Sequence, residues 1–166
     1  MASKAIIVTG APGSGKSTVI NYMLKLNLKD LVLFDIDSII VEASTLAGTD
    51  IHFEEDTWIP FRKIWISILK SVSKCGKVPV LFAVSDKKDF DSISDGIDLG
   101  WILLDCQDET RLKRIAERDY TKEQVKEVVE DANKMRKESN LIIDTTNLNI
   151  EEVSEKLLDL IKAEAY

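Results

Sequence analysis

The stretch Gly10-Ala-Pro-Gly-Ser-Gly-Lys-Ser17 matches the pattern G-x-x-x-x-G-K-[ST] at every fixed position. It directly follows the apolar run 4–9 and directly precedes an amphipathic stretch, 17–26, so it joins an expected strand to an expected helix. Glycines allow consecutive backbone N–H groups to turn inward around phosphate oxygens, and a helix that starts near Gly15 adds the positive end of its dipole. The pattern therefore predicts a phosphate-binding loop.

The residues of this loop have distinct expected roles. Lys16 brings a positive charge to the phosphates, and Ser17 offers a hydroxyl to Mg²⁺. The residues expected to hold the nucleotide are Gly10, Ala11, Pro12, Gly13, Ser14, Gly15, Lys16, Ser17 and Thr18. The alternative is a glycine turn that binds nothing, but such a match arises by chance in roughly one chain in a hundred or fewer. The position between a strand and a helix favours nucleotide binding further.

Length and composition limit what the chain can be. Its 166 residues suit one domain, 1–166, which is large enough to bury a core. Charged residues make up 31% and apolar residues 45%, and no apolar run approaches the roughly 18 residues of a membrane span. The start, Met1-Ala-Ser-Lys4, leads into an apolar run too short for a signal peptide. We therefore expect a cytoplasmic protein with no membrane partner.

Net charge and reactive side chains narrow the classes of site. A net charge of −7 disfavours nucleic acid as a partner, because such binding depends on clustered Lys and Arg. Cys75 and Cys106 form no C-x-x-C pair, so we expect neither a zinc site nor a redox pair. His52 is the only histidine and has no supporting pattern nearby, so we expect it in a solvated loop.

Four further segments have the pattern of strands buried on both faces: 31–35, 78–84, 100–105 and 141–144. Each is a short, nearly continuous apolar run. Helical patterns lie between these runs. Their alternation predicts an α/β fold, with an open and mostly parallel sheet of five strands that binds ligands at the carboxyl ends of its strands.

Three of the expected helices have recognisable starts. A long apolar stripe at helical spacing consists of Trp58, Phe61, Trp65, Ile68, Leu69 and Val72. Thr57 and Pro60 suit the first turn of that helix, and Gly76 suits its end. Thr121-Lys-Glu-Gln124 has the form of a capping box, and Asn149 suits the start of the last helix.

Two carboxylates follow the second expected strand. Phe34-Asp35-Ile36-Asp37 places Asp35 and Asp37 at the sheet edge that also carries the phosphate loop. A carboxylate here can orient or deprotonate an acceptor hydroxyl, and a second one can hold Mg²⁺ through water. The alternative is that Asp37 caps the following helix and Asp35 belongs to a turn.

Two more candidates lie on the acceptor side. Arg62 is one position from the apolar stripe, so we expect it either to clamp an anionic or polar acceptor or to be solvated beside Lys63. Asp86 follows the third expected strand, where many phosphate-loop proteins place a magnesium-associated acid. Its main alternative role is to cap the next helix.

Arg111, Arg114 and Arg118 are spaced three and four residues apart, so they lie on one side of an expected helix. The turn 118–121 joins this helix to the capped helix that begins near Thr121. We expect a short lid around 114–124 that carries positive charge over the phosphates, with Arg136 returning on its far side. A solvated helix face is the alternative.

The last expected strand ends in Asp144-Thr145-Thr146-Asn147. Because this strand end lies near the phosphate loop, the backbones of Thr146 and Asn147 are candidates for hydrogen bonds to an adenine edge. The same residues are equally typical of a plain turn from a strand to a helix.

Together these residues resemble the small P-loop kinases of the nucleoside and nucleotide kinase-like group, which includes adenylate, shikimate and gluconate kinases. The resemblance extends from Ile6 to Ile161. It is strongest in three segments: 10–18, the D-x-D pair Asp35-Ile-Asp37, and Arg114-Ile-Ala-Glu-Arg118.

The resemblance implies a three-layer fold with strand order 2-3-1-4-5, ATP and Mg²⁺ as cofactors, and a closing lid. It also implies that Arg114 stacks on adenine, that Arg118 reaches the transferred phosphate, and that residues 37–75 form an acceptor-side helical segment. Ser85-Asp-Lys-Lys88 departs from the acceptor motifs of the group, so it leaves the acceptor unassigned. The lid is also shorter than the long inserted lids of some adenylate kinases.

We therefore expect an ATP-dependent phosphotransferase that moves the γ-phosphoryl group to a hydroxyl or phosphate of a small metabolite, such as a nucleoside, nucleotide or sugar-like molecule. Two alternatives remain: a nucleotide-dependent switch or ATPase, and a polynucleotide 5′-hydroxyl kinase. A GTPase is disfavoured because the chain has no D-x-x-G, and an oligomeric AAA-type motor is disfavoured because the chain is too short for a helical lid subdomain. The oligomeric state stays open.

Overall fold

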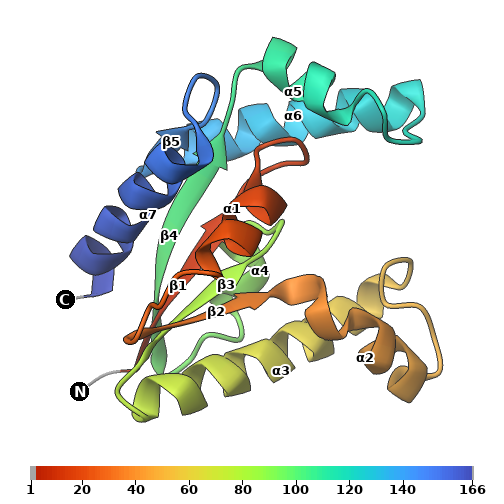
Figure 1. The fold of residues 1–166 in the computed structure, drawn as a ribbon. Coiled ribbons are helices and arrows are strands. Elements are labelled where there is room, and N and C mark those ends of the chain that lie inside the picture. The colour runs from red at the N-terminus through yellow and green to blue at the C-terminus, as the bar shows by residue number, and fades with distance from the viewer. Residues whose placement is uncertain (1–2, 166) are drawn as a thin grey trace.

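A single parallel sheet of order β2-β3-β1-β4-β5 organises the computed structural model, which describes residues 3–165 (Figure 1). Its strands are β1 Ser3–Thr9, β2 Leu31–Asp35, β3 Val78–Phe82, β4 Ile97–Asp105 and β5 Ile142–Asp144. All neighbouring strands pair in parallel. The predicted fold class and strand order are confirmed.

Strand register brings the predicted polar residues to one edge of the sheet. Thr9 pairs with Leu103, and Asp35 pairs with Phe82, so the carboxyl ends of the central strands are level. β1 has a neighbour on each side, and the chain continues from it into the phosphate loop. Ligands of open α/β sheets bind at such a point, where successive connections leave to opposite sides.

Two strand boundaries differ from the prediction by more than one residue. β4 begins at Ile97, three positions before Gly100, because Ile97 to Leu99 pair with Ser3 to Ala5. The exposed Asp98 interrupts the apolar run there and hides the start of the strand from the sequence pattern. β3 ends at Phe82, two residues before Val84.

The helices are α1 Lys16–Met23, α2 Ile40–Ala47, α3 Glu55–Lys74, α4 Lys88–Asp91, α5 Asp108–Ile115, α6 Lys122–Glu138 and α7 Ile150–Ala165. A short 3₁₀ helix, η1 Ile36–Ile39, follows β2. The sequence predicted Pro60 in the first turn of its helix, but this residue lies further inside α3. The reason is that the helix already begins at Glu55. None of the helices in residues 3–165 is both long and apolar enough to cross a membrane.

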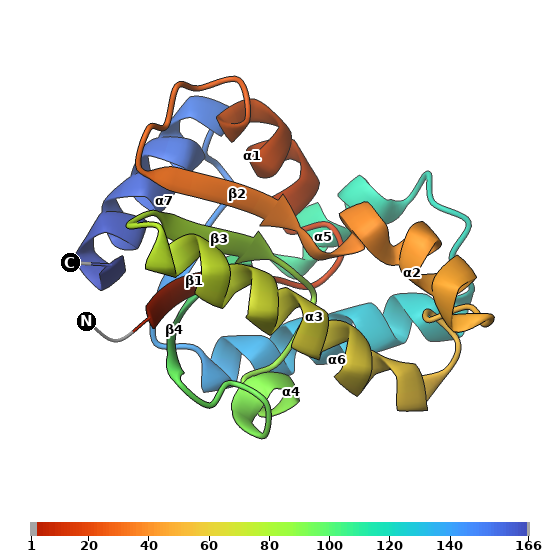
Figure 2. The same cartoon turned by 90° about the horizontal axis from the view of Figure 1, so that it is seen from below.

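Helices cover both faces of the sheet. Ile6 and Val8 of β1 pack against α1 and α7, whereas Ala5 and Ile7 pack against α3 on the opposite face. Figure 2 shows α3 lying across β1 and β3, with α6 on the same side of the molecule. α6 packs through Ala132 and Met135 onto Leu103 of β4. The sheet is therefore the middle of three layers.

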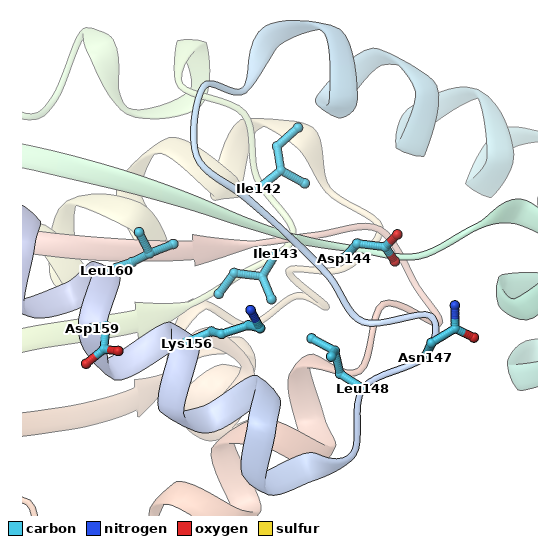
Figure 3. Close-up of a pocket in the computed structure, with 8 residues that line it drawn as sticks. All are labelled: Ile142, Ile143, Asp144, Asn147, Leu148, Lys156, Asp159 and Leu160. Atoms are coloured by element: carbon cyan, nitrogen blue, oxygen red, sulfur yellow. The ribbon is translucent and has the colours of Figure 1, made fainter.

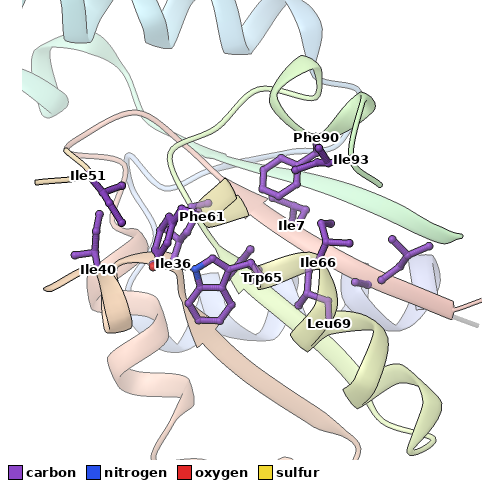
Figure 4. Close-up of a cluster of buried hydrophobic side chains, with 14 residues drawn as sticks. Ile7, Ile36, Ile40, Ile51, Phe61, Trp65, Ile66, Leu69, Phe90 and Ile93 are labelled. Atoms are coloured by element: carbon purple, nitrogen blue, oxygen red, sulfur yellow. Dashed lines mark hydrogen bonds between the residues drawn. The ribbon is translucent and has the colours of Figure 1, made fainter. Parts of the chain in front are cut away.

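Trp65 connects the core to the predicted acid pair. Its side chain is only 1% exposed, and its indole N–H donates a hydrogen bond to the carbonyl oxygen of Ile36 at 3.2 Å (Figure 4). Its ring also meets that of Phe34, with centroids 5.6 Å apart. Since Ile36 lies between Asp35 and Asp37, the core of α3 fixes the backbone that carries both carboxylates.

Candidate functional site

The loop between β1 and α1 has the backbone of a phosphate cradle. Gly13 and Gly15 adopt left-handed conformations, with φ of 82° and 100°, that strain other residues. Gly15 precedes the first residue of α1, which has neither a side-chain cap nor an acidic residue in its first turn. The first N–H groups of this helix and its positive dipole end therefore face the loop without a competing protein anion, which suits a phosphate.

Side chains hold the carbonyl groups of the loop, and all of these side chains except Lys16 come from outside the loop. Each carbonyl oxygen from Gly10 to Ser14 accepts at least one hydrogen bond. The side-chain donors to these carbonyls are Lys16, Arg111, Arg114, Cys106 and Thr145. Carbonyl and N–H groups of one trans peptide point in opposite directions, so outward carbonyls favour inward N–H groups.

Lys16 contributes the charge of the cradle. Its Nζ donates a hydrogen bond to the carbonyl oxygen of Gly10 and lies 3.5 Å from Oγ of Ser14. Burial, assisted by the charge of Arg111, lowers the pKa of Lys16 to about 8, while Asp35 opposes the shift. A bound polyphosphate would supply the counter-charge that this buried ammonium lacks.

A cavity of about 270 Å³ opens beside the loop. It is lined by residues 12–18 of the loop, 35–37 after β2, 82–84 after β3, and by Arg118 and Tyr120. Asp35 and Asp37 therefore share one cavity with Lys16, Ser17 and Thr18, as the sequence predicted.

The two acids of this cavity differ in their surroundings. Oδ1 of Asp35 accepts a hydrogen bond from the backbone N–H of Asp37 at 3.1 Å, so Asp35 is the residue that caps η1. Burial raises the pKa of Asp37, and the neighbouring Asp35 raises it further. A nearby cation would reverse this effect and favour the ionised pair.

A second cavity of about 360 Å³ lies on the other side of the loop. It is lined by loop residues, by Arg114 and Arg118, and by Thr145 and residues 148–150 at the start of α7. Gly13, Gly15, Thr18 and Arg118 line both cavities, so the two spaces meet at the loop. One elongated molecule can therefore contact both.

Arg114 and Arg118 have different supports. Arg114 donates hydrogen bonds to the carbonyl oxygens of Gly13 at 3.2 Å and Thr145 at 2.9 Å. Arg118 lies beyond the end of α5, so the prediction of three arginines on one helix face was wrong for this residue. Its Nη1 is 3.5 Å from the hydroxyl of Tyr120. Arg118 is thus the less restrained of the two.

The segment after β5 contains two predicted site residues, Thr146 and Asn147, and one that the sequence missed, Thr145. Thr145 is buried and reaches the loop, whereas the Thr146 N–H and hydroxyl both bond to Asp144. Asn147 lines a cavity of about 570 Å³ between β5 and α7, away from the phosphate loop (Figure 3). The sequence did not distinguish Thr145 from its polar neighbours, because only the fold shows which side chain points inward.

Three predicted site residues bind other parts of the protein. Arg62 lies 3.4 Å from Asp89 and stacks over the ring of Trp58, and Asp86 pairs with Lys134 of α6. Arg136 pairs with Asp105 and Asp108, and these hydrogen bonds raise its pKa. None of the three lines either cavity at the loop.

The oxygen groups beside the loop fit Mg²⁺ held jointly with a nucleotide. Within residues 3–165, no cluster of three or more His, Cys, Asp or Glu side chains is placed to bind a metal alone. Mg²⁺ typically takes one or two protein carboxylates or hydroxyls and completes its shell with phosphates and water. Ser17, Asp35 and Asp37 supply such groups in one cavity.

The sequence model of a family described as "AAA domain" matches residues 6–136, from β1 through the loop to α6. The chain belongs to the AAA domain family. The match includes the phosphate loop, so membership implies nucleotide binding by a P-loop domain. The expectation that the chain is not an oligomeric motor stays a prediction. No curated protein matches this AAA domain chain significantly.

Solved structures share the fold at low identity. A sugar kinase from Janibacter sp. HTCC2649 aligns with a TM-score of 0.66 and 16% identity, covering 96% of this chain and 95% of that one. The tunicamycin resistance protein of Deinococcus radiodurans gives 0.69 and 18%, covering 96% and 95%. The APS kinase of Mycobacterium tuberculosis gives 0.64 and 16%, covering 97% and 98%. This AAA domain protein therefore has the fold of small P-loop kinases.

Proposed function

We propose that the protein is an ATP-dependent phosphotransferase that moves the γ-phosphoryl group of Mg-ATP to a hydroxyl of a small metabolite. One observation carries the proposal: Asp35 and Asp37 line the same cavity as Lys16 and Ser17 of the phosphate loop. A carboxylate beside a phosphate loop is repelled by bound phosphate, so binding of phosphate alone does not explain it. Activation of a nucleophile does, because a carboxylate can accept the proton of an acceptor hydroxyl. A switch that only binds nucleotide can use one acid for Mg²⁺ but has no need of a second acid for a nucleophile.

The residues supply what phosphoryl transfer requires, which is positioning and neutralisation of charge. The loop N–H groups and Lys16 hold the phosphates, and Arg118, which lines the same cavity, offsets charge. Asp35 orients the acceptor hydroxyl and accepts its proton. Ser17 and Asp37 would hold Mg²⁺, which would supply positive charge that lowers the repulsion between the phosphates and the incoming oxygen.

The nucleoside part of ATP fits the second cavity. Arg114 lies at its wall with the planar guanidinium fixed by Gly13 and Thr145, and this geometry supports stacking on a flat base. The start of α7 closes the other side. Thr146 and Asn147 remain candidates for contacts to the adenine edge only if the turn after β5 rearranges.

A hydroxyl fits the acceptor side better than a phosphate does. Recognition of an acceptor phosphate requires free arginine or lysine groups. Arg62, the arginine that the sequence placed nearest to the acceptor, lies against Asp89 and two aromatic rings. The acids Asp35 and Asp37 remain to receive the acceptor, and they favour a neutral donor of hydrogen bonds.

The test is ADP release from Mg-ATP in the presence of matched acceptors: nucleosides with their monophosphates, and sugars with their sugar phosphates. We expect ADP only when a hydroxyl acceptor is present. ADP release that needs no acceptor would instead indicate an ATPase or a switch. Transfer to DNA or RNA ends, with an affinity that falls steeply as salt rises, would indicate a polynucleotide kinase.

A further inference from the structure

Asp105, the last residue of β4, lies between two arginines from different helices. Arg111 of α5 donates from Nη2 to Oδ1 of Asp105, and Arg136 of α6 donates from Nε to Oδ2. Nη2 of Arg136 also lies 3.3 Å from Oδ1. Arg111 is fully buried and Asp105 is 7% exposed. The triad of Asp105, Arg111 and Arg136 therefore joins the end of β4 to α5 and α6, the two helices that flank the expected lid.

The other end of the Arg111 guanidinium reaches the phosphate loop. Its Nη1 donates to the carbonyl oxygen of Pro12 at 2.8 Å and lies 3.4 Å from that of Ala11. The carbonyl of Pro12 and the N–H of Gly13 belong to one peptide plane and point in opposite directions. When Arg111 fixes the carbonyl, it therefore turns the Gly13 N–H toward the opposite side of the loop. Gly13 lines both cavities.

The loop rests directly on α5 at this point. A Cβ added to Gly13 would lie 3.0 Å from Cγ2 of Ile115 and 3.1 Å from Cγ of Arg111. Such close approach leaves the Pro12–Gly13 peptide no room to shift toward the helix. The position of Arg111 therefore determines the position of this peptide.

A gain in folding stability does not by itself explain why this triad of charged residues is buried. A buried ion pair is often no more stabilising than apolar residues of the same volume, because both charges lose their hydration. A guanidinium can, however, bond a carboxylate and a carbonyl at the same time in fixed directions, which an apolar side chain cannot do. The hydrogen bonds of Arg111 therefore suit a side chain that holds the loop in position.

We propose that Arg111 is a positioning residue for nucleotide binding, held by Asp105 and, through it, by Arg136. The triad preforms the Pro12–Gly13 peptide, so that its N–H is directed at phosphate before the nucleotide arrives. The inference rests on the loop binding a nucleotide, and it does not depend on the acceptor. It also makes α6 a support for the loop, although α6 contributes no residue to either cavity.

The probe for the test is Mg-ADP, and its Kd is measured by calorimetry on the full chain. Arg111→Met removes all the donors, and Arg111→Lys keeps the charge with a different donor geometry. We expect about 10-fold weaker binding for Arg111→Met, comparable to the loss of one hydrogen bond to a charged group, with partial recovery in Arg111→Lys. The matched control is Lys113→Met on the exposed face of α5, where Lys113 pairs with Glu109 and with no other acid among residues 3–165. The Lys113→Met variant should bind Mg-ADP with the Kd of the wild type.

Arg136→Gln keeps the proposal testable if Arg111→Met does not fold. Arg136 is partly exposed and reaches the loop only indirectly, through Asp105 and Arg111 and through Cys106, so we expect a smaller but measurable loss of Mg-ADP affinity. Melting curves measured in parallel separate a loss of folding stability from a loss of affinity for Mg-ADP. Lower melting temperatures with unchanged Kd in both Arg111→Lys and Arg136→Gln would overturn the proposal. If affinity falls as expected but no acceptor is phosphorylated, the positioning role stands and the proposed function fails.

Discussion

The hydroxyl oxygen of Thr145 lies 2.9 Å from the carbonyl oxygen of Ser14 and 3.0 Å from that of Asp105. Thr145 therefore connects the end of β5 to both the phosphate loop and the end of β4. It also accepts a hydrogen bond from Arg114 at 3.0 Å. A side chain 3% exposed thus supports two features of the site: the loop and Arg114.

Replacing Thr145 by Val should destabilise the protein, because the shape is kept while buried polar groups lose a partner. The expected loss is ~1–3 kcal/mol in the free energy of unfolding. Urea denaturation measures it, and Thr145→Ser, which retains the hydroxyl, is the matched control. A Val variant as stable as the Ser variant would show that this hydroxyl has no structural role.

Substitutions at Asp35 should separate capping from catalysis. Asp35→Asn can still accept the hydrogen bond from the Asp37 N–H, so stability should stay near wild type. Asp35→Ala should lose ~1 kcal/mol of stability, because the cap is removed. Both variants should lose about 100-fold or more in kcat, because neither side chain accepts a proton. Full activity of Asp35→Asn would disprove its role as the base.

Asp37 and Asp86 should differ in their effect on magnesium dependence. Asp37 lines the cavity with Ser17, whereas the carboxylate of Asp86 is bound to Lys134. Asp37→Asn should raise the Mg²⁺ concentration required for half-maximal activity, and Asp86→Asn should leave it unchanged. The reverse result would assign the metal to Asp86 and would require the Lys134 contact to open on binding.

Asp144 should contribute stability that depends on pH. Hydrogen bonds from the Thr146 hydroxyl and backbone hold the pKa of Asp144 below the usual range of an aspartate. A carboxyl whose pKa is lower in the folded state stabilises the fold above the unfolded pKa, and this contribution disappears as pH falls through the folded pKa. Asp144→Asn should therefore be less stable than wild type at pH 7, and the difference should shrink toward pH 3. Unfolding curves at several pH values measure it, and a constant difference would contradict the expectation.

Features that depend on short stretches of sequence could be predicted. The glycine pattern 10–17, the buried apolar strands and the capping box at Thr121 are all local. In the last of these, the backbone N–H groups of Thr121 and Gln124 bond to each other's side chains. Because each signal is complete within a few residues, the sequence was sufficient to predict the sheet and the loop.

Side chains whose partners come from distant elements could not be placed. Arg62 lies one position from an apolar stripe, but its partner Asp89 precedes β4, and Asp86 is bound by Lys134 of α6. Helical spacing correctly related Arg111 to Arg114, yet it could not show that Arg111 lies beneath the loop. A pattern indicates which side of a helix a residue occupies, and the fold decides what that side meets.

Phosphoryl transfer by this protein is tested most directly by ³¹P NMR of Mg-ATP with the protein and the best hydroxyl acceptor from the panel. The γ-phosphate signal should be replaced by that of a phosphate ester, with one ADP formed per ester. Lys16→Met should fold normally and give neither product. Release of inorganic phosphate alone, at a rate independent of the acceptor, would contradict the assignment as a phosphotransferase.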